Sequence, residues 1–397
     1  MTAAPAIGLD YQPAATGPFL WQAFDAGAVA ADLAAIARTG FREIRVGLAW
    51  DSFMPDARGV DPRRLGQLDT LLNQALAHSI RVIPVLFVQC HGDCVFLPRA
   101  TVRRDRVRRG VRVLSDGFVE PGGPRDVWAD PLMTELADRW SRTMAEQFAG
   151  HPAIAAWDLG DDPAGAVRPR RAADLAAWVA LAGAPLRERG DRVHLTVGAG
   201  DVLHARGVRL AALAPHLDRI DIAVRTAQLR DVGLAHESAI RFIAQLAQAL
   251  AGDTGTPVGM AVAMPSSRDD TQSSDEADTV ATAEQLIARR ASAGIRQLRA
   301  TRWSDLHPRL EARAPFDRAG WLLRSGLVRS GGSVKPALEV WSRAARDDAG
   351  DAAAHPWPPH IDVDAFYADL PGGLLDLVSA WHRAQDDQPA ILENGEH

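Results

Sequence analysis

Residues 151–163 read HPAIAAWDLGDDP. The apolar run from Ala153 to Trp157 predicts a buried β-strand, and we expect the turn after it to carry Asp158, Asp161 and Asp162. Carboxylates that lie side by side repel each other, so either water solvates them or the protein uses them. A buried strand that ends in polar residues is also the unit that repeats along the chain.

Eight segments of the chain have this strand pattern, and a helical pattern of about a dozen residues follows each of them. The predicted strands are Ile7–Asp10, Glu43–Leu48, Arg81–Val88, Ala153–Leu159, Val193–Val197, Arg219–Val224, Pro257–Ala263 and Ile295–Thr301. The predicted helices are Ala26–Arg38, Leu65–His78, Pro131–Ala149, residues 171–188, 204–214, 236–251 and 277–293, and one that begins near Lys335.

Alternation of strands and helices predicts a parallel sheet, and eight such units predict a closed (β/α)8 TIM barrel, an α/β fold. A doubly wound open sheet is the alternative, but no GxGxxG motif follows an early strand. We expect the barrel to occupy residues 1–348 as a single domain. Residues 349–397 are expected to form a C-terminal helical extension, with a packing helix at Gly373–His382.

The longest interruption, residues 89–130, follows the third predicted strand. Its Asp116–Gly117 pair predicts a β-hairpin. Residues 99–112 contain seven arginines, which raises the alternative of a nucleic-acid site. That segment has no interleaved aromatic residues and the whole chain is acidic, so we favour a solvated loop whose arginines pair within the molecule.

Composition indicates an ordinary globular protein. The chain has a net charge of −6, two cysteines and no apolar stretch long enough to span a membrane. The first residues lack the pattern of a signal peptide, and a disulfide framework is not expected. We therefore expect a cytoplasmic protein that binds neither nucleic acid nor membrane, and its oligomeric state is left open.

The active site of such a barrel lies at the C-terminal ends of its strands, so the polar residues there are candidates. Aromatic rings stack on sugar rings and carboxylates bind hydroxyl groups, so this set predicts a carbohydrate site. The residues are Tyr11, Gln12, Trp50, Asp51, Gln89, His91, Asp93, Asp161, Asp162, Asp201, Arg225, Ser266, Ser267, Arg302, Trp303 and Asp305.

The sequence resembles the cellulase-like glycoside hydrolases of clan A, nearest to glycoside hydrolase family 5. HPAIAAWDLGDDP is similar to the family's fourth strand, which usually reads W-D-L-G-N-E-P. ATRWSDLHP and the segment through SVKPAL are similar to its eighth strand and the region beyond. GLDYQP, the segment FREIRVGLAWDSFMP and the segment LDTLLNQALAHSIRVIPVLF resemble its first three units.

The resemblance implies roles for some residues, and it also implies that other functional residues of the family are replaced in this sequence. Asp162 stands at the position of the family's acid/base glutamate, and Asp161 stands where the family has asparagine. Ala261, or Ala263 in a shifted register, stands where the family has its nucleophilic glutamate. The family's His-x-Tyr pair on the sixth strand is replaced here by residues 223–225.

Retaining hydrolysis requires two carboxyl groups about 5 Å apart, and this pair is absent at the family's positions. Two hypotheses follow: a glycoside hydrolase with altered carboxylate chemistry, or a catalytically inactive relative that binds sugar or acts as a scaffold. A different barrel enzyme is a third. An inverting mechanism would need a base about 6.5–9.5 Å from Asp162, and its candidates are Asp51, Asp201, Asp269 and Asp305.

The expected partner is a carbohydrate. Residues expected to bind it are Tyr11, Arg45, Trp50, His91, Asp161, Asp201, Arg225, Trp303 and Asp305. Arg45 is expected to pair with a carboxylate inside the barrel, and Trp50 and Trp303 are either sugar platforms or buried aromatics. No cofactor is expected, and CHGDC at residues 90–94 has no second ligand pair for a metal. Ser266 and Ser267 lack the G-x-S-x-G pattern of a serine hydrolase.

Overall fold

A computed structural model describes most of the chain. The described residues are 7–87, 91–106, 109–225, 236–252, 254–263, 273–290, 293–295, 297–347, 357 and 361–386.

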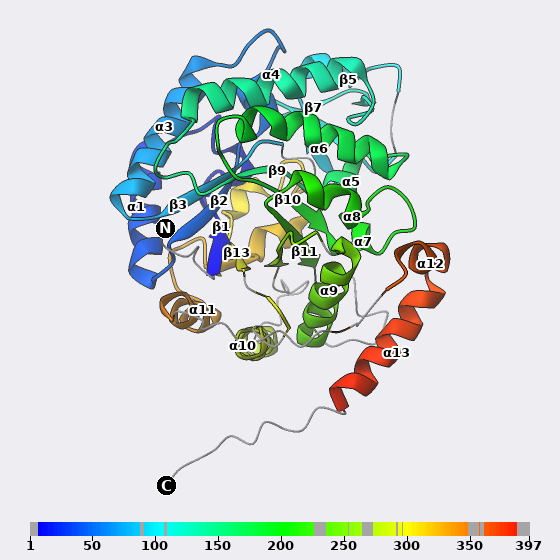
Figure 1. Ribbon diagram of the computed structural model, residues 1–397. Coiled ribbons are helices and arrows are strands. Elements are labelled where there is room, and N and C mark those ends of the chain that lie inside the picture. The colour runs from blue at the N-terminus through cyan, green and yellow to red at the C-terminus, as the bar shows by residue number, and fades with distance from the viewer. Residues whose placement is uncertain are drawn as a thin grey trace.

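Eight parallel strands form a closed barrel, as predicted. Each strand pairs with the next, and the pairing of the first with the last closes the sheet (Figure 1). The strands are β1 (Ile7–Asp10), β2 (Glu43–Gly47), β3 (Arg81–Val85), β9 (Trp157–Asp161), β10 (Val193–Gly198), β11 (Arg219–Arg225), β12 (Val258–Ala263) and β13 (Leu298–Ser304). A short ninth strand, β14 (Gly326–Val328), pairs with the end of β13.

Helices surround the barrel (Figure 1). Aspartate side chains accept hydrogen bonds from the first backbone N–H groups of three of them, which fixes where these helices begin. The longer helices are α1 (Ala26–Thr39), α3 (Pro62–Ala77), α4 (Pro131–Phe148), α6 (Ala172–Arg187), α9 (His236–Ala251), α10 (Ser273–Arg289) and α11 (Ala337–Arg346). The capping residues are Asp25, Asp61 and Asp130.

Two predicted elements differ from the structure. The helix predicted over 204–214 is wrong: two short helices, α7 (Ala199–Val202) and α8 (Leu210–Leu213), lie on either side of a bend at Gly207. The φ of Gly207 is 102°, in the left-handed region, so a continuous helix cannot pass through it. The fourth strand begins at Trp157 rather than Ala153, because Ile154 makes only an isolated bridge to Val82.

The segment after β3 forms a small separate sheet. Strand β6 (Arg112–Ser115) pairs with β4 (Cys94–Phe96) on one side and with β7 (Phe118–Glu120) on the other, and β5 (Val102–Arg103) pairs with β8 (Gly123–Pro124). Asp116 and Gly117 both have positive φ, which is typical of a two-residue hairpin turn and confirms the predicted hairpin.

Arginines of this segment pair with acidic side chains, as the sequence indicated. Arg99 pairs with Glu120 and Arg103 pairs with Asp105. Arg112 bridges Asp93 and Asp317, two residues that are far apart in the sequence.

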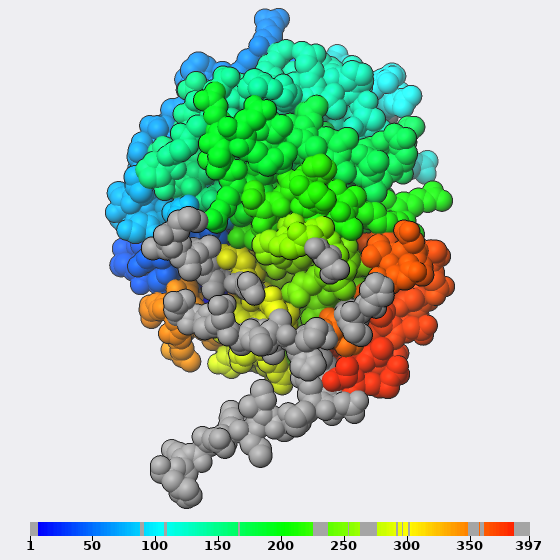
Figure 2. Space-filling view, in the orientation of Figure 1, coloured from blue at the N-terminus to red at the C-terminus, as the bar shows by residue number. Residues whose placement is uncertain are grey.

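Two helices, α12 (Val363–Ala368) and α13 (Gly372–Asp386), end the described chain and lie along one side of the barrel (Figures 1 and 2). Trp381 of α13 donates a hydrogen bond to Gln245 of α9 at 2.8 Å, and its ring meets Phe242 edge-on. The boundary predicted at residue 349 lies outside the described residues and stays a prediction. Among the described residues, the helices are all too short or too polar to cross a membrane.

Asp51 anchors the hairpin to the barrel. It lies on a short helix, α2 (Trp50–Phe53), directly after β2, and its carboxylate accepts a hydrogen bond from the backbone N–H of Asp116 at 2.7 Å. The side chain is fully buried, and this burial raises the pKa of Asp51 to about 7.

We predict that Asp51 makes folding pH-dependent. A carboxyl whose pKa is raised in the folded state stabilises the fold at low pH, and this contribution is lost as the pH rises from about 4 to about 7. Asp51→Asn should therefore show a smaller fall in Tm between pH 5 and pH 8 than the wild type. Thermal unfolding across this range is the measurement. Asp56→Asn, at a 57% exposed side chain, is the control and should follow the wild type.

Candidate functional site

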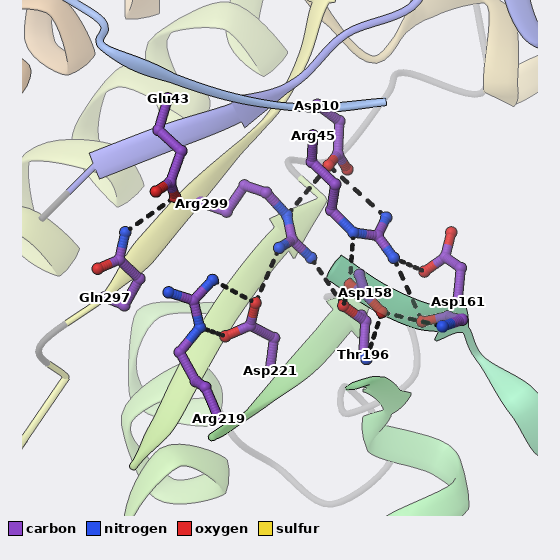
Figure 3. A network of polar contacts seen from close by, with 11 residues as sticks. Asp10, Glu43, Arg45, Asp158, Asp161, Thr196, Arg219, Asp221, Gln297 and Arg299 are labelled. Carbon is purple, nitrogen blue, oxygen red and sulfur yellow. Dashed lines mark hydrogen bonds and ion pairs between the residues drawn. The ribbon is translucent and has the colours of Figure 1, made fainter. Parts of the chain in front are cut away.

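Charged side chains fill the interior of the barrel, where branched aliphatic residues usually dominate (Figure 3). They project from β1, β2, β9, β11 and β13, and ion pairs and hydrogen bonds join them to one another and to two neutral side chains, Thr196 of β10 and Gln297 just before β13. We call this set the interior network. Its residues are Asp10, Glu43, Arg45, Asp158, Asp161, Thr196, Arg219, Asp221, Gln297 and Arg299.

At the centre of the interior network, Arg45 pairs with Asp158. Nε of Arg45 lies 2.8 Å from Oδ2 of Asp158, and the two side chains are 6% and 0% exposed. The hydroxyl of Thr196 donates a second hydrogen bond to Asp158 at 2.7 Å. Burial by itself raises the pKa of Asp158, but the Arg45 and Arg299 guanidinium groups outweigh it and hold this pKa below its usual value.

This geometry confirms that Arg45 pairs with a barrel carboxylate and corrects where the turn begins. The predicted strand ended at Leu159 and left Asp161 in the turn, whereas β9 includes both Asp158 and Asp161. A bulge lies between them: Asp158 is opposite His194 of β10, and Asp161 is opposite Thr196. The strand thus holds one extra residue beside the site, a place where bulges commonly redirect side chains.

A second pair lies deeper in the barrel. Arg299 contacts Asp221 at 2.9 Å, and Arg219 contacts the same carboxylate at 2.9 Å. Burial raises the pKa of Asp221 by itself, but the two guanidinium groups outweigh it and hold this pKa well below the usual range. His194 is buried beside them, and burial followed by the charge of Arg219 lowers its pKa to about 3, so the imidazole is neutral near pH 7.

Asp10 and Asp161 form the solvent side of the interior network. Oδ1 of Asp10 lies 3.0 Å from Arg299 and 3.8 Å from Arg45, and Oδ1 of Asp161 lies 3.5 Å from Arg45. Their side chains are 38% and 32% exposed, in contrast to the buried Asp158 and Asp221. Burial of its inner oxygen raises the pKa of Asp10, although Arg299 and Arg45 oppose this.

Asp162 directly follows β9, and its carboxyl lies over Gly198 at the end of β10. Its φ of 55° is in the left-handed region, and it precedes a short helix, α5 (Pro163–Ala166). A Cβ atom added at Gly198 would lie 2.3 Å from Oδ1 of Asp162, so the carboxyl occupies the space above this glycine. Asp162 therefore reaches the carboxyl end of the barrel, on the same side as Asp161.

Strand β12 presents small residues to the interior. A Cβ atom at Gly259 would lie 2.1 Å from Oδ1 of Asp221, so residue 259 faces inward, and the alternation of a strand makes Ala261 face inward as well. Ala261 is 8% exposed and lies opposite Ala223 of β11 and Arg299 of β13. All six residues of β12 are glycine, alanine, valine or methionine, so this strand carries no carboxylate.

The aromatic candidates are buried. Tyr11 is 1% exposed and its hydroxyl donates a hydrogen bond to Asp32 of α1 at 3.0 Å. Trp50 is 2% exposed and its ring lies edge-on to Phe87, and Trp303 is 5% exposed. The structure thus places Tyr11 and Trp50 in the core, which hides their ring faces from solvent, and any role of these three rings in sugar binding stays a prediction.

Two acidic candidates are held by cations. Asp201 pairs with Arg168 at 2.8 Å, and Asp305 pairs with Lys335 at 2.7 Å. Asp305 also accepts a hydrogen bond from the backbone N–H of Gly326. These contacts join loops at the carboxyl end of the barrel.

The remaining candidates are partly described. His91 lies edge-on to Phe316 at 6.0 Å between ring centroids. The side chain of Arg225, together with Gln89, Cys90, Ser266, Ser267 and Asp269, lies outside the described residues. Within the residues that the structure describes, no group of three or more histidine, cysteine, aspartate or glutamate side chains could hold a metal.

Sequence reasoning singled out only Arg45, Asp158 and Asp161 of the interior network. It missed Asp10, Glu43, Thr196, Arg219, Asp221, Gln297 and Arg299. A signal was present: charged residues stand inside otherwise apolar strands at every second position, as Glu43 and Arg45 do in β2. Alternation places such residues on one face of a strand, and in a closed barrel that face is the interior.

Comparison with known proteins finds neither a matching family model nor a matching curated protein. Many solved structures share the fold. A GH5_18 protein variant from Streptomyces cattleya in complex with Manβ1-4GlcNAc has a TM-score of 0.78 at 19% identity and covers 96% of this chain and 92% of its own.

Two further structures are similar. A GH5_18 protein from Bifidobacterium longum subsp. infantis has a TM-score of 0.71 at 18% identity, covering 88% of this chain and 80% of its own. The exo-β-1,4-mannosidase Op5Man5 from Opitutaceae bacterium strain TAV5 has a TM-score of 0.69 at 20% identity. That match covers 86% of this chain but 59% of the mannosidase. The chain therefore has the barrel fold of solved glycoside hydrolase family 5 structures.

We predict that the Arg45–Asp158 pair is essential for stability. Arg45→Met removes the charge that compensates the buried Asp158, and breaking a buried pair in this way costs about 3–5 kcal/mol. Urea denaturation measures the loss. Arg63→Met is the matched control, because Arg63 is 85% exposed and pairs with Asp61 at the surface, and it should change stability by less than about 1 kcal/mol. Equal stability of the two variants would contradict the prediction.

Proposed function

We propose that the protein binds a neutral, β-linked oligosaccharide containing mannose at the carboxyl end of its barrel and does not cleave it by double displacement. The observation that carries this proposal is the composition of β12: Ala261 faces the interior, and none of the six residues of this strand has a carboxylate.

Double displacement requires a carboxylate that attacks the sugar and a second carboxyl about 5 Å away. The methyl group of Ala261 cannot form a glycosyl–enzyme bond. Arg299 lies opposite Ala261 and pairs with Asp221, and Asp221 is 2% exposed, so a sugar cannot reach this carboxylate.

The choice of ligand rests on the carboxylates at the barrel end and on the solved structures with this fold. Asp10 and Asp161 are partly exposed there, and carboxylates are strong acceptors for sugar hydroxyl groups. Two of the similar structures are complexes with Manβ1-4GlcNAc. That disaccharide is therefore the first ligand to test.

A second candidate function is hydrolysis by single displacement, with Asp162 as the acid. The observation that favours it is the left-handed backbone of Asp162, because strained conformations of this kind gather at functional sites. In this alternative Asp162 gives its proton to the leaving oxygen, and a base on the other side of the sugar activates water.

We predict that the protein binds the disaccharide without forming a covalent adduct. Calorimetric titration with Manβ1-4GlcNAc should show binding, and incubation with a 2-deoxy-2-fluoro-mannosyl fluoride should leave the intact mass unchanged, because β12 provides no nucleophile. A stoichiometric adduct on any aspartate or glutamate would contradict the absence of double displacement. Absence of binding to any neutral β-mannoside would contradict the proposed ligand.

Substitution of Asp162 separates the two candidate functions. Asp162→Asn should change the affinity for Manβ1-4GlcNAc by less than about tenfold, since one neutral hydrogen bond contributes roughly 1 kcal/mol. If the wild type releases mannose, the same variant should lower turnover by about 100-fold or more. Asp138→Asn, on the surface of α4, is the control and should change neither quantity. Mannose release by the wild type that survives in Asp162→Asn would rule out Asp162 as the acid.

A further inference from the structure

One guanidinium group holds two partly exposed carboxylates at the end of the barrel. Figure 3 shows Asp10 on one side of Arg45 and Asp161 on the other. The two nitrogens at the tip of Arg45 make these contacts, Nη1 with Asp10 at 3.8 Å and Nη2 with Asp161 at 3.5 Å. The two carboxylates come from β1 and β9, strands that are far apart in the sequence.

Each of these carboxylates is fixed at one oxygen. Oδ1 of Asp10 is buried and lies 3.0 Å from Nε of Arg299, so the exposure of this side chain belongs to its other atoms. Oδ1 of Asp161 faces Arg45. Arg45 is itself held by Asp158, and Arg299 by Asp221, both of which are buried. The carboxylates therefore stand on rigid supports and need little ordering when a ligand binds.

The charges of the interior network do not balance. It contains three arginines, Arg45, Arg219 and Arg299, and five carboxyl side chains. Arg302 adds a further cation near Asp10, but one of its terminal nitrogens donates to the carbonyl of Leu322 and burial lowers its pKa to about 10. Glu43, Asp158 and Asp221 are buried, so the carboxyl side chains of the network that reach solvent are those of Asp10 and Asp161.

Hydroxyl groups are suitable hydrogen-bond donors for the two carboxylates of Asp10 and Asp161. A carboxylate accepts O–H···O⁻ bonds that are shorter and stronger than neutral hydrogen bonds. A ligand with a carboxylate or phosphate of its own would meet two like charges there, which is unfavourable.

We propose that Asp10 and Asp161 together bind hydroxyl groups of one neutral sugar residue and exclude acidic sugars from that position. This inference rests on the proposed function and adds to it the residues that recognise the sugar. Asp10 stands at a strand end that resemblance to the family did not single out.

The test compares Asp10→Asn and Asp161→Asn with the wild type in calorimetric titrations with Manβ1-4GlcNAc. Asparagine keeps the size and one acceptor oxygen but removes the charge, so each variant should bind about tenfold more weakly. A disaccharide of glucuronic acid and N-acetylglucosamine is titrated in parallel. It should bind the wild type at least tenfold more weakly than Manβ1-4GlcNAc, and the doubly substituted variant should reduce this preference.

Asp138→Asn is the control, because Asp138 has the same 38% exposure as Asp10 but lies on α4. It should bind like the wild type. Thermal unfolding checks that each variant is folded. If Asp10→Asn does not fold, Asp161→Asn decides the test, since Asp10 also pairs with Arg299 at 3.0 Å and its loss would disturb the interior network more.

Three outcomes would contradict the proposal, and each contradicts a different part of it. If the wild type binds Manβ1-4GlcNAc and both folded variants bind it equally well, then Asp10 and Asp161 do not bind the sugar, while the proposed function stands. If the acidic disaccharide binds the wild type as tightly as the neutral one, the exclusion of acidic sugars is wrong. If the wild type binds no neutral β-mannoside, the proposed function fails and this inference fails with it.

Discussion

The buried ion pair of Arg45 and Asp158 is the interaction on which the rest of the site depends. It joins β2 to β9, and Thr196 extends it to β10. Two charges removed from water are costly unless both are paired and hydrogen-bonded, and here both are. A shift of either strand by one residue would turn one partner to the outside and leave the other unpaired. The pair therefore favours a single register for the barrel.

This way of filling the barrel has consequences for the neighbouring strands. Large aliphatic side chains usually fill the interior of such a fold, whereas here long arginines and aspartates occupy it. Glycines make room for them: the carboxylate of Asp221 takes the space beside Gly259, and Asp162 takes the space above Gly198. A side chain at either glycine would collide with a carboxylate, so the small residues and the ionic residues depend on each other.

The same network divides the acidic residues into two classes. Asp158 and Asp221 are buried, and their pKa values are held low by arginines, which suits a structural role. Asp10 and Asp161 share the same arginines but reach solvent, and the pKa of Asp10 is raised. The fold is that of many glycoside hydrolases, but fold does not fix chemistry, and the groups at the strand ends determine what the barrel can do.

The sequence by itself determined the eight strands, most of the helices between them and the hairpin at Asp116, because periodicity and turn chemistry are local properties. It also indicated that Arg45 pairs with a carboxylate, because an unpaired charge inside a strand of the barrel would be costly. The sequence did not determine with which carboxylate Arg45 would pair. A bulge in β9 moved Asp158 inward and Asp161 toward solvent, and closure of the barrel brought Asp10 and Arg299 together from opposite ends of the chain. Such contacts join residues that only the closed sheet makes neighbours, so tertiary structure alone decided them.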